Sequence, residues 1–208
     1  LFGPEGRQDE LLTHAVAPAV AEARAGRWFF SRYLEGPGRR PHLRVRVRAS
    51  ASAAFTAALQ ERLAPWARMG ALVSLESGPF HRELGRYGGV PTCLDVEALF
   101  ALDSADALTT MGADEPLVAQ AARFEALARG LGLGLTARLR LAEQLADAAL
   151  DDESLHARLS QEHRRQRTLA ADLAAPHPLE RRVRAARARW TPARVRAIVG
   201  VLPPVLHM

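Results

Sequence analysis

The sequence predicts an α+β fold, with a small antiparallel sheet packed with helices in the N-terminal half and a mainly helical C-terminal half. Two short segments, 27–33 and 42–48, are rich in aromatic or alternating apolar residues and predict the strands. Beyond residue 93, apolar residues recur mostly at helical spacing. We expect one domain over residues 1–208, with its sheet-containing part over about 1–92 and its helical part over about 93–208.

An amphipathic helix is predicted over residues 9–25, ahead of the first strand. Its apolar stripe consists of Leu12, Val16 and Val20. Pro18 lies inside this helix and predicts a kink or a break, because proline lacks a backbone donor. The connection between the two strands, residues 34–41, is too long for a tight hairpin but allows the strands to pair antiparallel.

The rest of the chain is predicted to be helical apart from one short strand and one irregular segment. Helical spacing predicts helices over 51–69, 94–108, 116–131, 135–150, 154–175 and 191–201. The buried side of the first consists of Phe55, Leu59, Leu63 and Trp66. A short strand is predicted over 71–75. Residues 78–92 are rich in glycine and charge, which is typical of a segment that carries a site.

Composition limits the classes of partner. All 28 basic residues are arginine and the formal net charge is +5, but lysine is absent and alanine abundant, as in proteins from GC-rich genomes. The arginine excess is therefore a poor indicator of nucleic-acid binding. No apolar run approaches the roughly 20 residues of a membrane span. The single cysteine, Cys93, excludes an internal disulfide and suits a reducing cytoplasm. We expect a cytoplasmic protein that binds neither nucleic acid nor membrane.

Four basic side chains are predicted to share one face of the second strand. Side chains alternate along a strand, so His42, Arg44, Arg46 and Arg48 point away from the apolar residues between them. Same-face neighbours lie about 7 Å apart, and guanidinium groups at that spacing repel one another unless an anion lies across them. Two interpretations remain open here: a solvated edge kept polar by charge, or an anion-binding site.

Two further segments carry candidate site residues. Glu83 and Arg86 are three residues apart, so they predict either a surface ion pair or an acid/base carboxylate with an anion clamp. Gly88-Gly89 follows them and allows positive φ or close approach of a ligand. His207 predicts either a buried or capping histidine or a general acid/base.

Other chemistries have little support in the sequence. It lacks a nucleophile elbow, a phosphate-binding loop and a dinucleotide fingerprint, and its histidines lack metal-ligand spacing. We therefore expect no cofactor and no metal. Asp103-Ser104 is interpreted as the cap of the following helix.

Five motifs occur together in one order along the chain. They are Trp-Phe-Phe-x-Arg-Tyr (28–33), His-Leu-Arg-x-Arg (42–46), Glu-x-x-Arg-Tyr-Gly-Gly (83–89), Glu-x-Leu-Phe-x-x-Asp-Ser (97–104) and a terminal Leu-His-Met (206–208). In this order the chain resembles, over essentially its whole length, the C-terminal glutamate-elimination domain of class I lanthipeptide dehydratases. This family is also called the thiopeptide-type bacteriocin biosynthesis domain.

The resemblance implies a reaction and a set of site residues. In that family a separate domain first glutamylates Ser or Thr of a ribosomal precursor peptide, using glutamyl-tRNA. The elimination domain then removes the Cα proton and expels glutamate, which leaves a dehydroamino acid. The implied catalytic residues are Arg44 and Arg46 as glutamyl clamps, Glu83 as the group that orients them, Arg86, and His207 as the proton shuttle. The implied substrate-binding residues are His42, Arg48, Arg32, Tyr87 and Gly88.

Two alternative functions accompany this interpretation. The sequence lacks the glutamylation domain, so a stand-alone enzyme is expected, and thiopeptide pathways use a stand-alone relative of the same fold, the pyridine synthase. That enzyme joins two dehydroalanines in a formal aza-[4+2] cycloaddition, with loss of water and leader peptide. The second alternative is a non-catalytic module that binds the leader peptide. The expected partner is a precursor peptide with leader and core; a separate glutamylation protein and self-association remain open.

Overall fold

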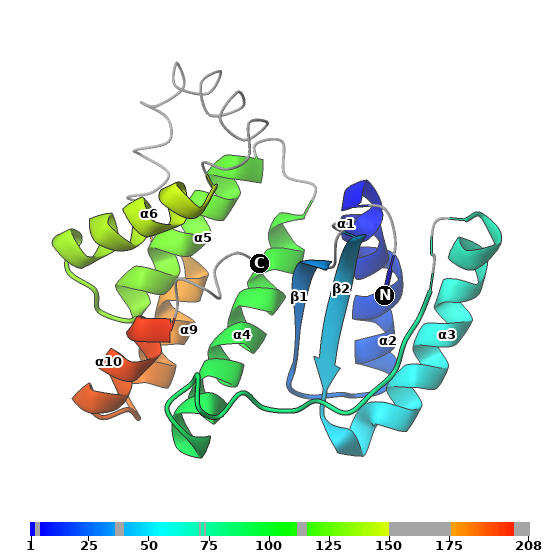
Figure 1. Ribbon diagram of the computed structural model, residues 1–208, viewed down its shortest axis with the longest axis horizontal. Coiled ribbons are helices and arrows are strands. Elements are labelled where there is room, and N and C mark those ends of the chain that lie inside the picture. Colours follow the sequence, from blue (N-terminus) through cyan, green and yellow to red (C-terminus); the bar gives the residue numbers. More distant parts are fainter. Residues whose placement is uncertain are drawn as a thin grey trace. The chain divides into compact units, whose positions relative to one another are not determined.

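The computed structural model describes residues 1–2, 5–35, 40–70, 72, 74–111, 116–149 and 176–201. The predicted helix over 154–175 and His207 lie outside these residues. The chain divides into two compact units, and each is described by itself. Among the described residues, the first unit holds 1–84 and 93–112, and the second holds 85–92 and the chain beyond 113. The elements are labelled in Figure 1.

The first unit is built on a two-stranded antiparallel ribbon. Strands β1 (Trp28–Glu35) and β2 (Arg40–Val47) pair in a register that places Phe30 opposite Val45 and Ser31 opposite Arg44. The predicted antiparallel strands are therefore confirmed, and so is the α+β class. Phe2 forms single bridges to His42 and Ser74, which extends pairing beyond the outer edge of β2. Ser74 lies in the segment predicted as a short strand.

One face of the ribbon is packed with helices. They are α1 (Gln8–Leu11), the π-helical turn η2 (Leu12–Val16), α2 (Ala17–Glu22) and α3 (Ser52–Arg68) (Figure 1). Leu12, Phe55 and Leu59 of these helices are buried in one core with Phe30 and Leu43 of the ribbon. The chain does not break at the proline: η2 continues directly into α2, whose first residues include the proline, and the departure from α-helical geometry is the wider turn η2 ahead of it.

Helix α4 (Val90–Thr110) runs beside the β1 edge of the ribbon (Figure 1). The Phe30 backbone N–H donates to Ser104 Oγ over 3.1 Å, and Ser104 is buried. The interpretation of Asp103-Ser104 as a helix cap was wrong, because α4 passes straight through both residues. The Ser104 hydroxyl instead accepts from an N–H on the outer edge of β1, beside which the described residues form no further strand.

Removing this hydroxyl is expected to destabilise the protein. Ser104→Ala leaves the buried Phe30 N–H without its acceptor, at a cost of about 1–3 kcal/mol in the free energy of unfolding. Denaturant titration measures this change. Thr110→Ala is the matched control, because the Thr110 hydroxyl donates to the Ala107 carbonyl of its own helix, over 3.1 Å, and not to a strand. Equal stabilities of the two variants would contradict the role of Ser104.

The described part of the second unit is helical. It contains α5 (Pro116–Gly130), α6 (Leu135–Ala149), α9 (Pro178–Arg187) and α10 (Pro192–Val201). Three of these helices match their predicted ranges closely, whereas α9 was not predicted as a helix of its own. Its arginines obscure the apolar pattern, although Leu179 and Val183 are fully buried. His177 caps this helix, since its Nδ1 accepts from the Leu179 N–H over 3.2 Å.

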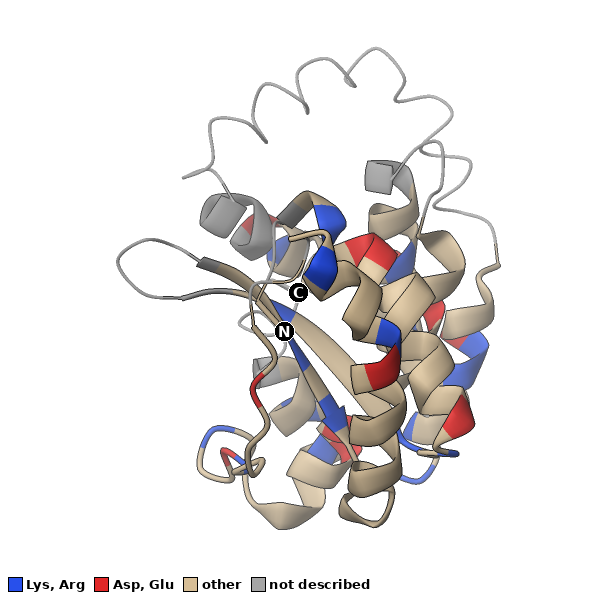
Figure 2. Ribbon diagram, turned by 90° about the vertical axis from the view of Figure 1, so that its right-hand side faces the viewer, with Lys and Arg blue, Asp and Glu red and all other residues tan. Residues whose placement is uncertain are grey.

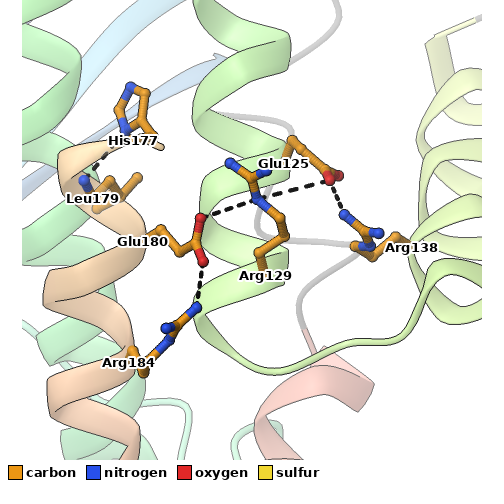
Figure 3. A network of polar contacts seen from close by, with 7 residues as sticks. All are labelled: Glu125, Arg129, Arg138, His177, Leu179, Glu180 and Arg184. Carbon is orange, nitrogen blue, oxygen red and sulfur yellow. Dashed lines mark hydrogen bonds and ion pairs between the residues drawn. The ribbon is translucent and has the colours of Figure 1, made fainter. Parts of the chain in front are cut away.

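A chain of ion pairs connects three helices of the second unit (Figure 3). Arg129 of α5 lies 3.0 Å from Glu180 of α9 and 3.9 Å from Glu125 of its own helix. Glu125 also pairs with Arg138 of α6, and Glu180 with Arg184. Each carboxylate therefore lies between two guanidinium groups, and its negative charge reduces the repulsion between them.

Helices α5 and α9 approach each other closely at Gly130. A Cβ atom at this position would lie 2.6 Å from Val183 Cβ and 2.9 Å from the Glu180 carbonyl oxygen. Gly132, two residues later, has a φ of +75°, which ends α5 in the left-handed region that glycine adopts without strain. Gly130-Leu-Gly-Leu-Gly134 is thus a helix break, as the sequence predicted.

Among the helices of the described ranges, none has the length and hydropathy needed to cross a membrane.

Candidate functional site

The second face of the ribbon carries the basic side chains. Of the residues that the register places on this face, six form what we call the arginine face: Phe29, Ser31, Tyr33, His42, Arg44 and Arg46. Figure 2 shows arginine positions recurring along the ribbon. Ser31 and His42 are buried, whereas Arg44 and Arg46 are half-buried. The predicted alternation is therefore confirmed, and the arginines are held in a more enclosed setting than a solvated sheet edge.

Arg44 is fixed by two neighbours on the arginine face. Its Nε donates to His42 Nε2 over 3.1 Å, and its guanidinium carbon lies 4.0 Å from the centre of the Tyr33 ring. The His42 ring is itself stacked between Phe2, at 4.7 Å, and Tyr33, at 5.6 Å. The result is a guanidinium group held in one orientation.

Arg46 lies beside a second aromatic ring and a carboxylate. Its guanidinium carbon is 4.9 Å from the centre of the Phe80 ring, which contacts Phe29 edge-on at 6.1 Å. Burial and the positive charge of Arg44 lower the pKa of Arg46, and the negative charge of Glu83 acts in the opposite direction. The charge at Arg46 is therefore costly in this setting, and a bound anion would offset that cost.

The structure brings together only part of the predicted site set. Arg44, Arg46, His42 and Glu83 belong to the first unit and lie at or near the arginine face. Arg48 is exposed and follows β2, which ends at Val47, so it does not continue the row. Arg32 lies on the opposite face of the ribbon, where it forms an ion pair with Asp9.

Three other predicted residues belong to the second unit. The Arg86 guanidinium carbon lies 5.7 Å from the centre of the neighbouring Tyr87 ring. Gly88 has a φ of +71° and Gly89 a φ of +92°, which confirms that this pair takes the backbone conformation that side chains disfavour. A Cβ on Gly88 would lie 3.9 Å from Ala197 of α10.

Several residues around the arginines were not singled out from the sequence. Tyr33 could have been found, because the period of two that aligns the arginines also places it opposite His42. Phe80 could not, since it lies in an irregular segment with no period to orient it. Arg82 and Glu97 form an ion pair across 15 residues of sequence, for which the sequence offers no local signal.

In the part of the chain that the structure describes, no three His, Cys, Asp or Glu side chains gather closely enough to hold a metal ion. The arrangement on the arginine face instead offers two half-buried guanidinium groups, aromatic walls and a nearby carboxylate. This combination can bind a carboxylate or phosphate and stabilise negative charge that develops during a reaction.

Comparison with known proteins points to one family. The family model described as "Lantibiotic biosynthesis dehydratase C-term" matches residues 1–208. No curated protein matches the chain. Among solved structures, the chain is similar to the tRNA dependent lantibiotic dehydratase MibB from Microbispora sp. 107891, with 24% sequence identity and a TM-score of 0.63. The match covers 100% of this chain and 25% of MibB, so the chain spans about a quarter of that protein's length.

Proposed function

Because the chain belongs to the family of lantibiotic dehydratase C-terminal domains, we propose that it eliminates glutamate from glutamylated Ser or Thr residues of a ribosomally made precursor peptide. The reaction breaks the Cα–H bond and the Cβ–O bond to the glutamyl ester. The Cα proton passes to a base, and the electron pair forms the Cα=Cβ double bond as glutamate leaves. Negative charge develops on the peptide carbonyl oxygen when the proton is removed. It ends on the carboxylate of the departing glutamate, so the site needs cationic groups near both positions.

The pair Arg44 and Arg46 is the observation that carries this proposal. Both guanidinium groups are half-buried on one face, and Arg46 has its pKa lowered by burial and by Arg44. Among the described residues Arg46 forms no ion pair, so it is available to an anion. A glutamyl ester carries one free carboxylate, and its esterified carboxyl becomes a second carboxylate when the Cβ–O bond breaks. Two forked cations at adjacent same-face positions suit such a ligand.

Roles for the remaining residues follow the same proposal. Glu83 orients Arg46, which is consistent with its electrostatic effect on that arginine. Arg86 acts as a further anion clamp, and His207 moves the proton. His42 holds Arg44 through its ring nitrogen. Neither a metal nor an organic cofactor takes part in this scheme, because arginines supply the charge stabilisation and an imidazole the acid/base group.

The two outer edges of the ribbon are relevant to the alternative function, in which the chain only binds a leader peptide. Peptides that dock by strand addition need an open row of backbone donors and acceptors. On the outer edge of β1 the Phe30 N–H is taken by Ser104, and on the outer edge of β2 the Leu43 N–H donates to the Leu1 carbonyl over 2.8 Å. A peptide would therefore reach the arginine face across the ribbon more readily than along its edges.

Two synthetic peptides separate the three functions. One carries a glutamyl-Ser, and the other carries a leader, azoles and two dehydroalanines; the mass of each is followed after incubation with the purified chain. Loss of glutamate from the first supports the eliminase. Release of the leader from the second with formation of a pyridine macrocycle would show a cycloaddition enzyme instead. Binding of either peptide without a change in mass would leave the docking module.

The Arg46→Lys variant is expected to acquire a pH dependence that the natural protein lacks. A lysine has an ordinary pKa of about 10.4. Burial and Arg44 lower the pKa of a cation at position 46, so the lysine is charged at low pH and loses its proton as the pH rises through that lowered value. Arginine remains charged throughout. We therefore expect kcat/KM for glutamate release to fall in the variant only, at a pH below the ordinary lysine value of about 10.4. Parallel profiles for the two proteins would contradict this reasoning.

A further inference from the structure

Arg82 and Glu97 form a two-point ion pair in the first unit. Arg82 Nε lies 2.5 Å from Glu97 Oε1, and Nη2 lies 3.0 Å from Oε2. The Glu97 side chain is only 9% exposed, and its bonds to Arg82 raise the pKa of that arginine. A buried carboxylate in this geometry is held firmly, because losing its partner would leave a charge without compensation.

The two partners flank one segment of the chain. Residues 85–92 belong to the second unit, whereas the chain on either side of them belongs to the first. Arg82 precedes the segment, and Glu97, in α4, follows it. The ion pair therefore joins the two flanks of a segment that carries Arg86, the Gly88-Gly89 pair and the first residues of α4.

The same ion pair lies next to the residues around Arg46. Glu83 follows Arg82 directly in the chain. The Arg82 guanidinium carbon lies 5.9 Å from the centre of the Phe80 ring, and the Arg46 guanidinium carbon lies 4.9 Å from the same ring. Phe80 is thus in contact range of both arginines, and a shift of Arg82 would be felt at Phe80 and at Glu83.

We propose that Arg82 and Glu97 are positioning residues, which anchor Glu83 beside Arg46 and hold together the two ends of the segment 85–92. The expected effect on reaction rate rests on the proposed elimination function. The anchoring of residues 83–92 by the ion pair is a structural prediction that can be tested without it. Glu97 acts through Arg82 and need not touch the substrate. Arg82 supplies two bonds at fixed spacing, which a lysine cannot reproduce.

Three variants test the proposal. Glu97→Gln removes the charge of the carboxylate, and Arg82→Lys keeps the positive charge but loses the fork. The double variant Arg82→Gln/Glu97→Gln removes both charges together, so neither is left buried alone if a single variant unfolds. Arg62→Gln is the control, because it breaks a half-exposed ion pair with Glu22, 2.8 Å long, between α3 and α2.

Two readouts are needed, one of which is independent of activity. Hydrogen exchange of peptides covering residues 83–92 is expected to speed up by about tenfold or more in the Glu97→Gln and double variants and to stay unchanged in Arg62→Gln. For glutamate release we expect kcat to fall by about 10- to 100-fold with KM changed little, and Arg82→Lys to lie between these variants and the natural protein.

The outcomes separate this proposal from the proposed function. If the natural chain releases no glutamate but exchange still rises in the variants, the elimination function fails and the anchoring role stands. If the natural chain is active and the folded variants keep both its exchange and its kcat, the positioning role is overturned. A drop in thermal stability with unchanged exchange over 83–92 would likewise overturn it, since it shows a purely structural ion pair.

Discussion

Replacing Arg46 with alanine is expected to lower the rate of glutamate release by about a hundred- to a thousandfold. Arg46 is half-buried beside Phe80, and among the described residues it forms no ion pair that would compete with an anion. A cation that stabilises charge developing in the transition state affects kcat more than substrate binding. The truncation also removes the repulsion between Arg46 and Arg44, so we expect stability to be kept or slightly raised.

Controls for this variant come from the same chain. Arg62→Ala removes an arginine of α3 that pairs with Glu22 of α2 and does not belong to the arginine face, and it is expected to leave the rate unchanged. Arg48→Ala tests whether an exposed arginine just beyond the end of β2 contributes to the rate. We expect it to reduce the rate much less than Arg46→Ala. Equal losses for these two variants would indicate a diffuse electrostatic effect rather than a clamp at Arg46.

Gly130→Ala is expected to destabilise the protein by about 3 kcal/mol. The added methyl group would lie 2.6 Å from Val183 Cβ and 2.9 Å from the Glu180 carbonyl oxygen, and neither atom is the end of a flexible side chain. Gly130 has no positive φ, so the backbone itself would accept alanine and the effect comes from the clash between α5 and α9. Thermal unfolding is expected to shift down by about 6–12 °C.

Gly78→Ala is the matched control for this variant. A Cβ on Gly78 meets nothing within 4 Å, and its backbone has no positive φ. Its unfolding temperature should therefore match that of the natural protein, or rise slightly because alanine restricts the unfolded chain. A Gly130→Ala protein that unfolds at the same temperature as Gly78→Ala would show that the two helices can move apart at little cost.

The ribbon and most of the helices could be predicted from the sequence because their patterns are local. A period of two placed His42, Arg44 and Arg46 on one face, and the register shows the same arrangement. Helical periodicity located α3, α5, α6 and α10 within a few residues. Helix α9 was not recognised because four arginines within ten residues leave few apolar positions to reveal a period.

The remaining features depend on partners far away in sequence. Ser104 follows an aspartate, a local pattern typical of a cap, but its hydroxyl bonds a strand 74 residues earlier. Arg32 and Arg44 both belong to the ribbon, yet Arg32 pairs with Asp9 and Arg44 lies on the arginine face. In the sequence, only the alternation of side chains along the strands distinguishes the two. The ion pair of Arg82 with Glu97 gives no signal in the sequence, because any of several carboxylates could have been its partner.

The pairing register of the ribbon determines both which side chains enter the core and which side chains lie on the arginine face. Leu43, which is buried in the core with the helices, lies between His42 and Arg44 in the sequence. A slip of one residue in the pairing would turn the arginines toward that core and Leu43 toward the arginine face. Guanidinium groups cannot be buried among apolar side chains without a large loss of stability, so a ribbon with the shifted register would be unstable. The stability of the core therefore selects the register, and every folded molecule has His42, Arg44 and Arg46 on the arginine face.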